Sequence, residues 1–259
     1  MSGVALVTGA NRGLGRETCL RLARTGKHVL LTARSLEAAT EAVAELRAEF
    51  ERGSIEALEL DVTDDASIGR AFEHVVGSGE RLDVLVNNAG VAFDGFDADV
   101  ARRTIEVNLF GAERTTYAFA SIMTDGGRVV MVSSESGTIS RLSEALRERF
   151  CDPALDRAGL HALVNEFIED VMAERSQRSG WPTSAYAVSK AAMNALTRIA
   201  ARDLPHLRIN AVSPGWVRTR MGGSGAPRSL AEGAGSIVWA TGVDVPTGGF
   251  FRDGRRIPW

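Results

Sequence analysis

Two side chains with complementary acid–base chemistry, Tyr186 and Lys190, stand four residues apart in a stretch of helical periodicity. The chain has only two tyrosines and two lysines, so this spacing rarely arises by chance. On a helix, both side chains lie on one face, where the ammonium group can lower the pKa of the phenol from its ordinary value of about 10. Such a phenol can donate or accept a proton, although an aromatic packing residue beside a surface lysine would have the same spacing.

A second motif is the glycine-rich turn Thr8-Gly9-Ala10-Asn11-Arg12-Gly13-Leu14-Gly15. It lies between the first predicted strand and the first predicted helix. At that position a backbone can approach a pyrophosphate, and the helix N-terminus attracts negative charge. The spacing is Gly-x3-Gly-x-Gly rather than the commoner Gly-x-Gly-x2-Gly, so a tight turn without a ligand stays an alternative.

The end of the second predicted strand indicates which dinucleotide would bind. An NAD site presents Asp or Glu to the ribose 2′-hydroxyl at this point, whereas this chain has Ala33-Arg34. Arg34 and Arg12 would instead pair with a 2′-phosphate, because two guanidinium groups suit a dianion. This favours NADP (NADPH), with two solvated arginines as the alternative.

The elements that must position these residues follow from an alternation of short apolar runs with longer stretches of helical period. The predicted strands are 4–8, 28–33, 55–60, 84–86, 128–132, 208–212 and 249–251. The predicted helices are 14–24, 36–51, 66–76, 100–120, 185–203 and 230–240. The pattern predicts an α/β fold: a single doubly wound Rossmann-like domain over residues 1–259, with a mostly parallel seven-stranded sheet.

Two helical segments have a predicted buried face. In the helix 36–51 that face consists of Leu36, Ala39, Val43, Leu46 and Phe50. Residues 135–183 interrupt the strand–helix alternation and predict a helical insertion before the Tyr186 helix. The buried face of the insertion comprises Leu160, Leu163, Val164, Phe167, Ile168, Val171 and Met172.

Composition excludes several classes of protein. The 259 residues are 44% hydrophobic and 24% charged with a net charge of −3, which excludes disorder and makes nucleic acid an unexpected partner. Cys19 and Cys151 lie far apart, and the four histidines have no zinc-site spacing, so neither a disulfide framework nor a metal site is expected. The sequence has no apolar run of about 18 residues, so we expect a cytoplasmic protein with no membrane association.

Taken together, these residues resemble the motifs of the short-chain dehydrogenase/reductase family over nearly the whole chain. The matching motifs are Thr8 to Gly15, Asn87-Asn88-Ala89-Gly90, Asn108, Ser134, Tyr186-x3-Lys190 and Pro214-Gly215. The carbonyl reductase branch is the most similar, because a long insertion precedes the tyrosine and two segments match that branch. Those segments are Gly180-Trp181-Pro182-x-Ser184-Ala185-Tyr186 and Pro214-Gly215-Trp216-Val217-Arg218-Thr219.

The resemblance implies four catalytic residues. Tyr186 would be the general acid that protonates the substrate oxygen, and Ser134 would hydrogen-bond the same oxygen. Lys190 would also hold the nicotinamide ribose, and Asn108 would position a water for a proton relay. Ser134 is chosen by motif from three neighbouring serines, and Glu135 is interpreted as a solvated carboxylate outside the mechanism.

The resemblance also implies the binding residues. Asp61 and Val62 would frame the adenine, and Val217 to Thr219 would contact the carboxamide side. The full set of expected cofactor contacts is Gly9, Asn11, Arg12, Gly13, Leu14, Gly15, Arg34, Asp61, Val62, Asn88, Tyr186, Lys190, Pro214, Gly215, Val217 and Thr219. Ser134, Tyr186 and Trp216 would contact the substrate. The run Gly222 to Gly225 is either a mobile lid or an ordinary flexible loop.

These inferences predict NADPH-dependent reduction of a small-molecule ketone, aldehyde or quinone to an alcohol. The insertion is either a wall of the substrate pocket or a helical cover over the Tyr186 helix, and the resemblance implies a monomer. An alcohol dehydrogenase working in the oxidative direction would use the same residues. A non-catalytic NADP-sensing module is the alternative of another class. A sensor could lose Ser134, Tyr186 and Lys190 freely, so their joint presence favours an enzyme.

Overall fold

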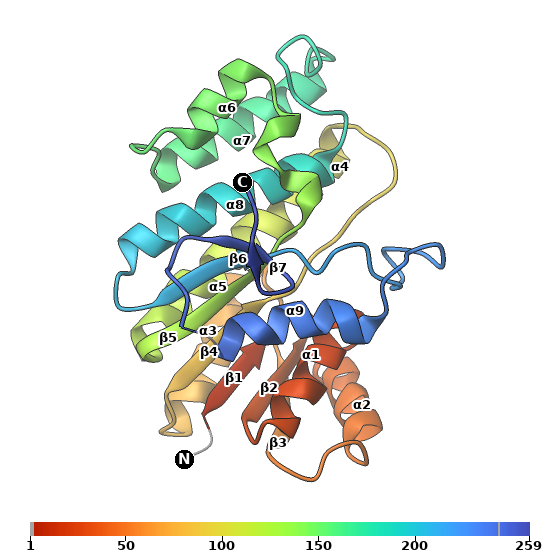
Figure 1. Ribbon diagram of the computed structural model, residues 1–259, viewed down its shortest axis with the longest axis vertical. Coiled ribbons are helices and arrows are strands. Elements are labelled where there is room, and N and C mark those ends of the chain that lie inside the picture. The colour runs from red at the N-terminus through yellow and green to blue at the C-terminus, as the bar shows by residue number, and fades with distance from the viewer. Residues whose placement is uncertain (1–2, 243) are drawn as a thin grey trace.

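The computed structural model describes residues 3–242 and 244–259, and its central element is one sheet of eight strands (Figure 1). Their order is β3-β2-β1-β4-β5-β6-β7-β8, and neighbouring strands are parallel except for β7 and β8. The strands are β1 (Val4–Val7), β2 (His28–Ala33), β3 (Ser54–Glu59), β4 (Leu82–Asn87), β5 (Met123–Val132), β6 (Arg208–Val212), β7 (Phe250–Arg252) and β8 (Arg255–Arg256). The order reverses at β1 and β4, which creates a crevice at the carboxyl ends of the strands.

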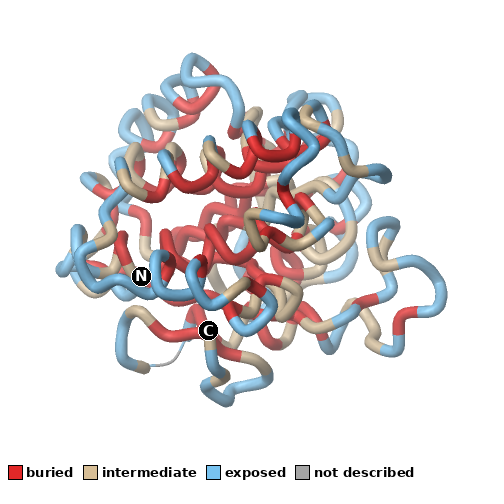
Figure 2. Tube along the Cα trace, turned by 90° about the horizontal axis from the view of Figure 1, so that it is seen from above, coloured by how far each residue is buried: buried red, intermediate tan, exposed pale blue. Residues whose placement is uncertain are grey.

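Helices cover both faces of the sheet (Figure 1). They are α1 (Gly13–Arg24), α2 (Leu36–Leu46), α3 (Asp65–Gly77), α4 (Ala98–Ile105), α5 (Gly111–Phe119), α6 (Glu144–Cys151), α7 (Arg157–Met172), α8 (Ala185–Asp203) and α9 (Leu230–Gly242). One apolar core lies under α1, α2 and α9, and a larger one lies under α3, α5, α7 and α8. The buried trace in Figure 2 accordingly runs through the interior between exposed outer turns.

The predicted α/β class and doubly wound, mostly parallel sheet are confirmed. The predicted bounds of β2, α8 and β6 are those of the structure. The sheet has eight strands rather than seven, because Asp253–Gly254 forms a two-residue turn with both φ angles positive that folds β8 back on β7.

The helix predicted over 36–51 is too long, since α2 ends at Leu46. Beyond Leu46 the charged side chains are exposed, so no apolar stripe remains to hold further turns against the sheet. Leu36 begins the helix with its side chain exposed, and Phe50 packs against the core from outside the helix. The prediction was therefore wrong for the end of the helix and for these two of its five face residues.

The insertion folds as two short 3-10 turns, η3 (Glu135–Gly137) and η4 (Ile139–Arg141), followed by α6 and α7. Helix α7 packs on α4 and α8, as Figure 1 shows at the top of the molecule. Six of its seven predicted face residues are buried. Met172 is exposed, because it ends the helix one position after buried Val171 and is therefore rotated away by about 100°.

Buried carboxylates fix the insertion to the rest of the fold. Glu113 on α5 is buried and accepts hydrogen bonds from Arg157 Nε (2.7 Å) and from His161 (Nε2 at 2.8 Å) on α7. Asp170 at the end of α7 accepts from Trp181 Nε1 at 3.0 Å and from Arg175 Nε at 2.7 Å. These contacts fix the segment that leads into α8, the helix that carries Tyr186 and Lys190.

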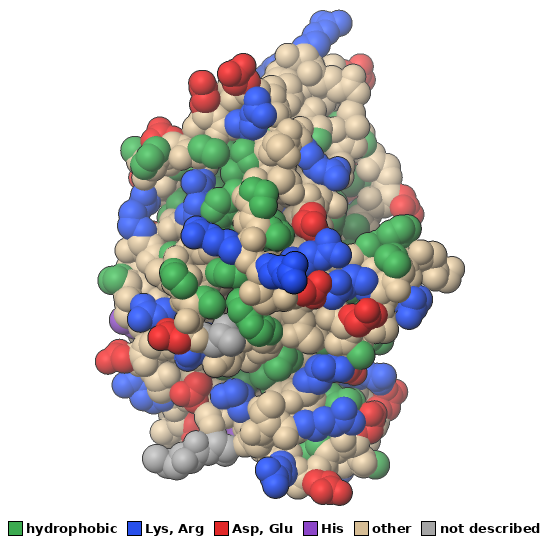
Figure 3. Space-filling view, in the orientation of Figure 1, with side chains coloured by type: hydrophobic (Ala, Val, Ile, Leu, Met, Phe, Trp, Pro, Cys, Tyr) green, Lys and Arg blue, Asp and Glu red, His purple; other side chains and the backbone are tan. Residues whose placement is uncertain are grey.

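No helix in the described part of the chain is long and apolar enough to cross a membrane. On the face drawn in Figure 3, Lys and Arg side chains are mixed with Asp and Glu side chains rather than forming one continuous basic surface.

Replacing Asp170 by Ala should lower the free energy of unfolding by about 2–3 kcal/mol, because the buried indole N–H of Trp181 would lose its acceptor. Asp170→Asn is the control, since its amide oxygen still offers the Trp181 indole N–H an acceptor while the charge that pairs with Arg175 is removed. Urea unfolding of both variants measures the difference. Equal losses in the two variants would contradict the role assigned to Trp181.

Candidate active site

The glycine-rich turn follows β1 and needs glycine at particular positions. Gly9 has φ +59°, and a Cβ there would lie 2.9 Å from the Ala89 Cα. A Cβ on Gly15 would lie 2.5 Å from the Asn88 Nδ2. That Nδ2 donates to the carbonyl oxygens of Thr8 (2.8 Å) and Gly9 (3.0 Å), so Asn88 ties the turn after β1 to the end of β4.

The N-terminus of α1 has no side-chain cap. Its N-cap, Arg12, makes no capping hydrogen bond, and the first turn contains no acidic residue. By contrast, Ser or Asp side chains cap α2, α3, α4, α6, α7 and α8. The free backbone N–H groups at the start of α1 are therefore suited to an anionic group such as a pyrophosphate.

Arg12 and Arg34 lie at the same edge of the sheet. The Ala10 N–H donates to the Thr32 carbonyl oxygen at 2.7 Å, which joins the glycine-rich turn to the end of β2. Both arginine side chains are exposed, and neither has a hydrogen bond or ion pair with any residue that the structure describes. Two guanidinium groups are thus available to a phosphate beside the turn.

Tyr186 lies in the first turn of α8, which begins after a cap in which the Ser184 hydroxyl accepts from the Ala187 N–H at 3.2 Å. The Ser134 side chain lies close enough to the Tyr186 phenol to influence its pKa. Ser133 does not compete for this position, because its hydroxyl is buried and donates to the Asn194 Oδ1 at 2.6 Å. Ser134 is therefore the member of this serine pair that lies beside the tyrosine.

The pKa of Tyr186 is raised rather than lowered, contrary to the sequence-based expectation. Burial of the phenol is the largest cause, and the neighbouring Ser134 hydroxyl offsets it only in part. The ammonium of Lys190 lies 5.7 Å from the centre of the Tyr186 ring. The tyrosine therefore holds its proton at neutral pH, as a proton donor must.

Lys190 is buried, with 4% of its surface exposed. Its ammonium donates to the Val132 carbonyl oxygen at 2.8 Å, at the end of β5 and next to the serines. Burial lowers the pKa of Lys190 to about 8. A strongly shifted amine beside a phenol at a strand end is the kind of group that marks a functional site.

Asn108 lies in a single π-helical turn, η1 (Glu106–Phe110), which joins α4 to α5 and was not predicted within the helix 100–120. Its side-chain oxygen accepts from the Val91 N–H at 2.8 Å, and its Nδ2 donates to the Ser189 hydroxyl at 2.9 Å. The π turn therefore brings Asn108 against α8, at a kind of irregularity common in functional sites.

The remaining predicted contacts lie in loops at the same edge. Asp61 is turned toward its own loop, where its carboxylate accepts from the Thr63 N–H and hydroxyl, and Val62 is buried against Gly111. Val217 is also buried and lies with Leu14 around Gly233, and the Thr219 methyl group lies near Gly13. Asn11, Pro214 and Gly215 belong to the turns that follow β1 and β6. Trp216 is 60% exposed.

Glu135 is partly solvated, with 44% of its side chain exposed, but it also has two polar partners that the sequence did not reveal. Its Oε2 accepts from Arg252 Nη1 at 2.7 Å and from the Ser213 hydroxyl at 3.3 Å. Arg252 and Ser213 stand far from Glu135 in the sequence, and no spacing pattern pointed to them. In the described residues no group of three or more His, Cys, Asp or Glu side chains is arranged to hold a metal ion.

Comparison with known proteins gives consistent matches. A family model described as short chain dehydrogenase matches residues 3–145, and one described as enoyl-(acyl carrier protein) reductase matches residues 171–237. The chain is 39% identical to carbonyl reductase [NADPH] 3 of Rattus norvegicus, over 92% of this chain and 90% of that protein. It is 35% identical to carbonyl reductase [NADPH] 1 of Bos taurus, over 99% and 98%. Salutaridine reductase from Papaver somniferum has a similar structure, with a TM-score of 0.90, 29% identity and coverage of 97% and 99%.

The burial of Lys190 predicts how stability depends on pH. Its pKa is lowered on folding, so above about pH 8 the unfolded chain holds more protons than the folded one, and the free energy of unfolding rises with pH. Between about pH 7 and about pH 9 this contribution should amount to about 1 kcal/mol. Urea unfolding of the wild type and of Lys190→Met measures it. An identical pH dependence in both proteins would contradict a buried ammonium at this position.

Proposed function

Because the chain belongs to the short-chain dehydrogenase/reductase family, we propose that it reduces the carbonyl group of an uncharged ketone, aldehyde or quinone to an alcohol with NADPH. The observation that carries the proposal is the gathering of Ser134, Tyr186 and Lys190 at the sheet edge that also bears the glycine-rich turn. NADPH, when bound, would supply the hydride.

Residues of the chain are suited to bind each part of NADPH, from the adenine end to the nicotinamide end. The glycine-rich turn and the uncapped start of α1 would hold the pyrophosphate, while Arg12 and Arg34 would pair with the 2′-phosphate. Asp61 and Val62 would frame the adenine, mainly through their backbone, because the Val62 side chain packs inward. Further contacts at the nicotinamide end would come from Lys190, Pro214, Gly215, Val217 and Thr219.

Tyr186 would donate the proton. Its raised pKa keeps the phenol protonated, and the neighbouring Ser134 hydroxyl would hydrogen-bond the same substrate oxygen. Negative charge grows on that oxygen as the carbonyl is reduced, so two fixed donors there stabilise the transition state more than the ground state. The buried ammonium of Lys190 would favour the phenolate that remains after proton transfer.

Asn108 would support proton return to this site. Its side chain is committed to Val91 and Ser189, so it is held rigidly beside α8. We propose that a water anchored beside it connects Lys190 with solvent.

The substrate would be an apolar molecule. Trp216, Met221 and Phe93 expose large apolar side chains on the loops that follow β6 and β4. The Trp216 indole N–H donates to the Gly222 carbonyl oxygen at 2.8 Å, which fixes the ring against its own loop. Exposed apolar side chains at these loops favour an uncharged substrate.

We also propose that residues 1–259 act as one NADP-binding domain and as a monomer. Helix α7 of the insertion packs across α4 and α8 and covers those helices within the chain itself. A cytoplasmic location stays a prediction from the sequence.

Tyr186→Phe should lower the kcat of NADPH oxidation with aldehydes, ketones and quinones by about 100- to 10,000-fold, because the general acid is lost. The NADPH Kd should stay within about threefold. The matched control is Tyr117→Phe, the other tyrosine of the chain, whose hydroxyl donates to Asp203 on the far part of α8. Steady-state kinetics and nucleotide titration measure both. Full activity in Tyr186→Phe would refute the assignment.

Arg34→Glu should reverse cofactor preference, because it replaces a phosphate partner with an acceptor for the 2′-hydroxyl. We expect kcat/KM with NADPH to fall about 10- to 100-fold while kcat/KM with NADH is unchanged or higher. Arg47→Glu, an exposed arginine at the end of α2, controls for the change in net charge. An equal loss in both variants would remove Arg34 from the proposed site.

A further inference from the structure

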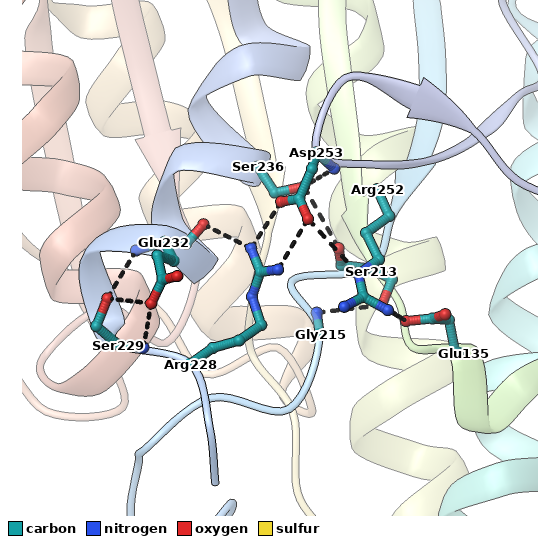
Figure 4. Close-up of polar contacts among 9 residues, drawn as sticks. All are labelled: Glu135, Ser213, Gly215, Arg228, Ser229, Glu232, Ser236, Arg252 and Asp253. Carbon is teal, nitrogen blue, oxygen red and sulfur yellow. Dashed lines mark hydrogen bonds and ion pairs between the residues drawn. The ribbon is translucent and has the colours of Figure 1, made fainter.

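The loop that carries Ser134 and the loop that carries Gly215 are joined by a polar network (Figure 4). At its first end, the Glu135 carboxylate accepts from the Ser213 hydroxyl at 3.3 Å. The Ser213 Oγ in turn accepts from the Gly215 N–H at 3.2 Å. Glu135 therefore contacts, through one hydroxyl, the backbone turn proposed to meet the nicotinamide end of the cofactor.

The second end of the network lies in the β7–β8 turn. Arg252 places Nη1 2.7 Å from the Glu135 Oε2 and Nε 3.6 Å from the Asp253 Oδ2. Asp253 binds Arg228 through both carboxylate oxygens, at 2.6 and 2.8 Å, and its N–H donates to the Ser236 hydroxyl at 2.9 Å. Arg252 is thus the link between Glu135 and the Asp253–Arg228 pair.

Arg228 closes the network on the same turn from outside. A Cβ on Gly215, whose φ is +76°, would lie 2.6 Å from the Arg228 Cδ, so the arginine side chain packs directly on this glycine. The backbone N–H of Arg228 donates to the Trp216 carbonyl oxygen at 3.2 Å, and Val217 pairs with Arg228 in an isolated β-bridge. The loop 216–228 is therefore tied at its two ends to one another and to the network.

The two loops differ in what else holds them. The Ser134 loop is fixed by α8, because Ser133 binds Asn194 and a Cβ on Gly137 would lie 2.4 Å from the Lys190 backbone carbon. The side chains of the network tie the Gly215 turn to that loop, in addition to the backbone hydrogen bond in which the Ser133 N–H donates to the Val212 carbonyl oxygen at 2.8 Å. Loss of the network should therefore loosen the Gly215 turn and leave Ser134 in place.

We propose that Glu135 and Arg252 are positioning residues that hold the Gly215 turn against the Ser134 loop, and so set the affinity for the nicotinamide end of NADPH. This inference rests on the proposed function. The ion pair itself is exposed by 38% at Arg252 and 44% at Glu135, so its contribution to overall stability is small. Its effect is expected in the geometry of the site rather than in the unfolding of the chain.

The test compares Arg252→Met, Glu135→Gln and the double variant with Arg256→Met. Arg256 is the control because it lies exposed in the same β7–β8 hairpin. Two ligands are titrated by calorimetry: NADPH, and 2′-phospho-ADP-ribose, which lacks the nicotinamide. We expect each single variant to raise the NADPH Kd about three- to tenfold, and the double variant to be no worse than the weaker-binding single one, because both changes break one network.

The truncated ligand separates positioning from general damage. Its Kd should change less than about twofold in all variants, and the KM for NADPH should rise while kcat at saturation stays within about twofold. Equal weakening of both ligands, additive effects in the double variant, or an unchanged NADPH Kd in Arg252→Met would overturn the proposal.

Hydrogen exchange measured without added nucleotide tests the coupling between the two loops independently of the proposed function. Glu135→Gln and Arg252→Met should each speed exchange in 213–228 at least about threefold, although Glu135 lies far from that segment in the sequence. If exchange rates changed only in residues adjacent in the sequence to each substitution, the proposal would be overturned. If the wild type binds neither ligand, the proposed function fails, while faster exchange in 213–228 would still support the coupling.

Discussion

The structure depends on the burial of one ammonium group, that of Lys190. Lys190 is only 4% exposed, so burying its ammonium is costly, and the partner that offsets this cost is a backbone carbonyl at the end of β5 rather than a carboxylate. This hydrogen bond fixes the Lys190 side chain, and with it helix α8, directly to the edge of the sheet. It also brings the Ser134 loop and Tyr186 to the same place, because the loop continues β5 and the tyrosine lies one turn before Lys190.

Much of the surrounding structure serves to hold α8 in that position. Asn108 approaches it through a π turn, Asn194 binds Ser133, and α7 of the insertion packs along it. The insertion is in turn fixed by the buried carboxylates of Glu113 and Asp170. Their partners include Arg157 and Arg175, whose side chains are partly exposed to solvent. The glycine-rich turn is supported separately, by Asn88 at the neighbouring strand. Two independently braced parts therefore meet at the crevice where the strand order reverses.

The sequence predicted well what depends on local pattern. The spacing of Tyr186 and Lys190, the glycine-rich turn and the bounds of α8 required only residues near one another in the chain. Prediction from the sequence failed where interacting residues are distant in the chain, or where burial decides at which residue a helix or strand ends. The end of α2 at Leu46, the short β8 strand and the π turn at Asn108 depend on tertiary packing. The pairing of Glu135 with Arg252 joins residues 117 positions apart, and no periodicity reveals such a contact.

Under the proposed function, this chain transfers hydride from NADPH to a carbonyl carbon. The most direct test is to incubate the wild-type protein with uncharged aldehydes and ketones and with NADPH that carries deuterium at the transferable position of the nicotinamide. The products are then analysed by mass spectrometry. We expect alcohols with deuterium on the former carbonyl carbon, in amounts equal to the NADPH consumed. NADPH binding without any labelled alcohol would contradict it and would favour a sensing module.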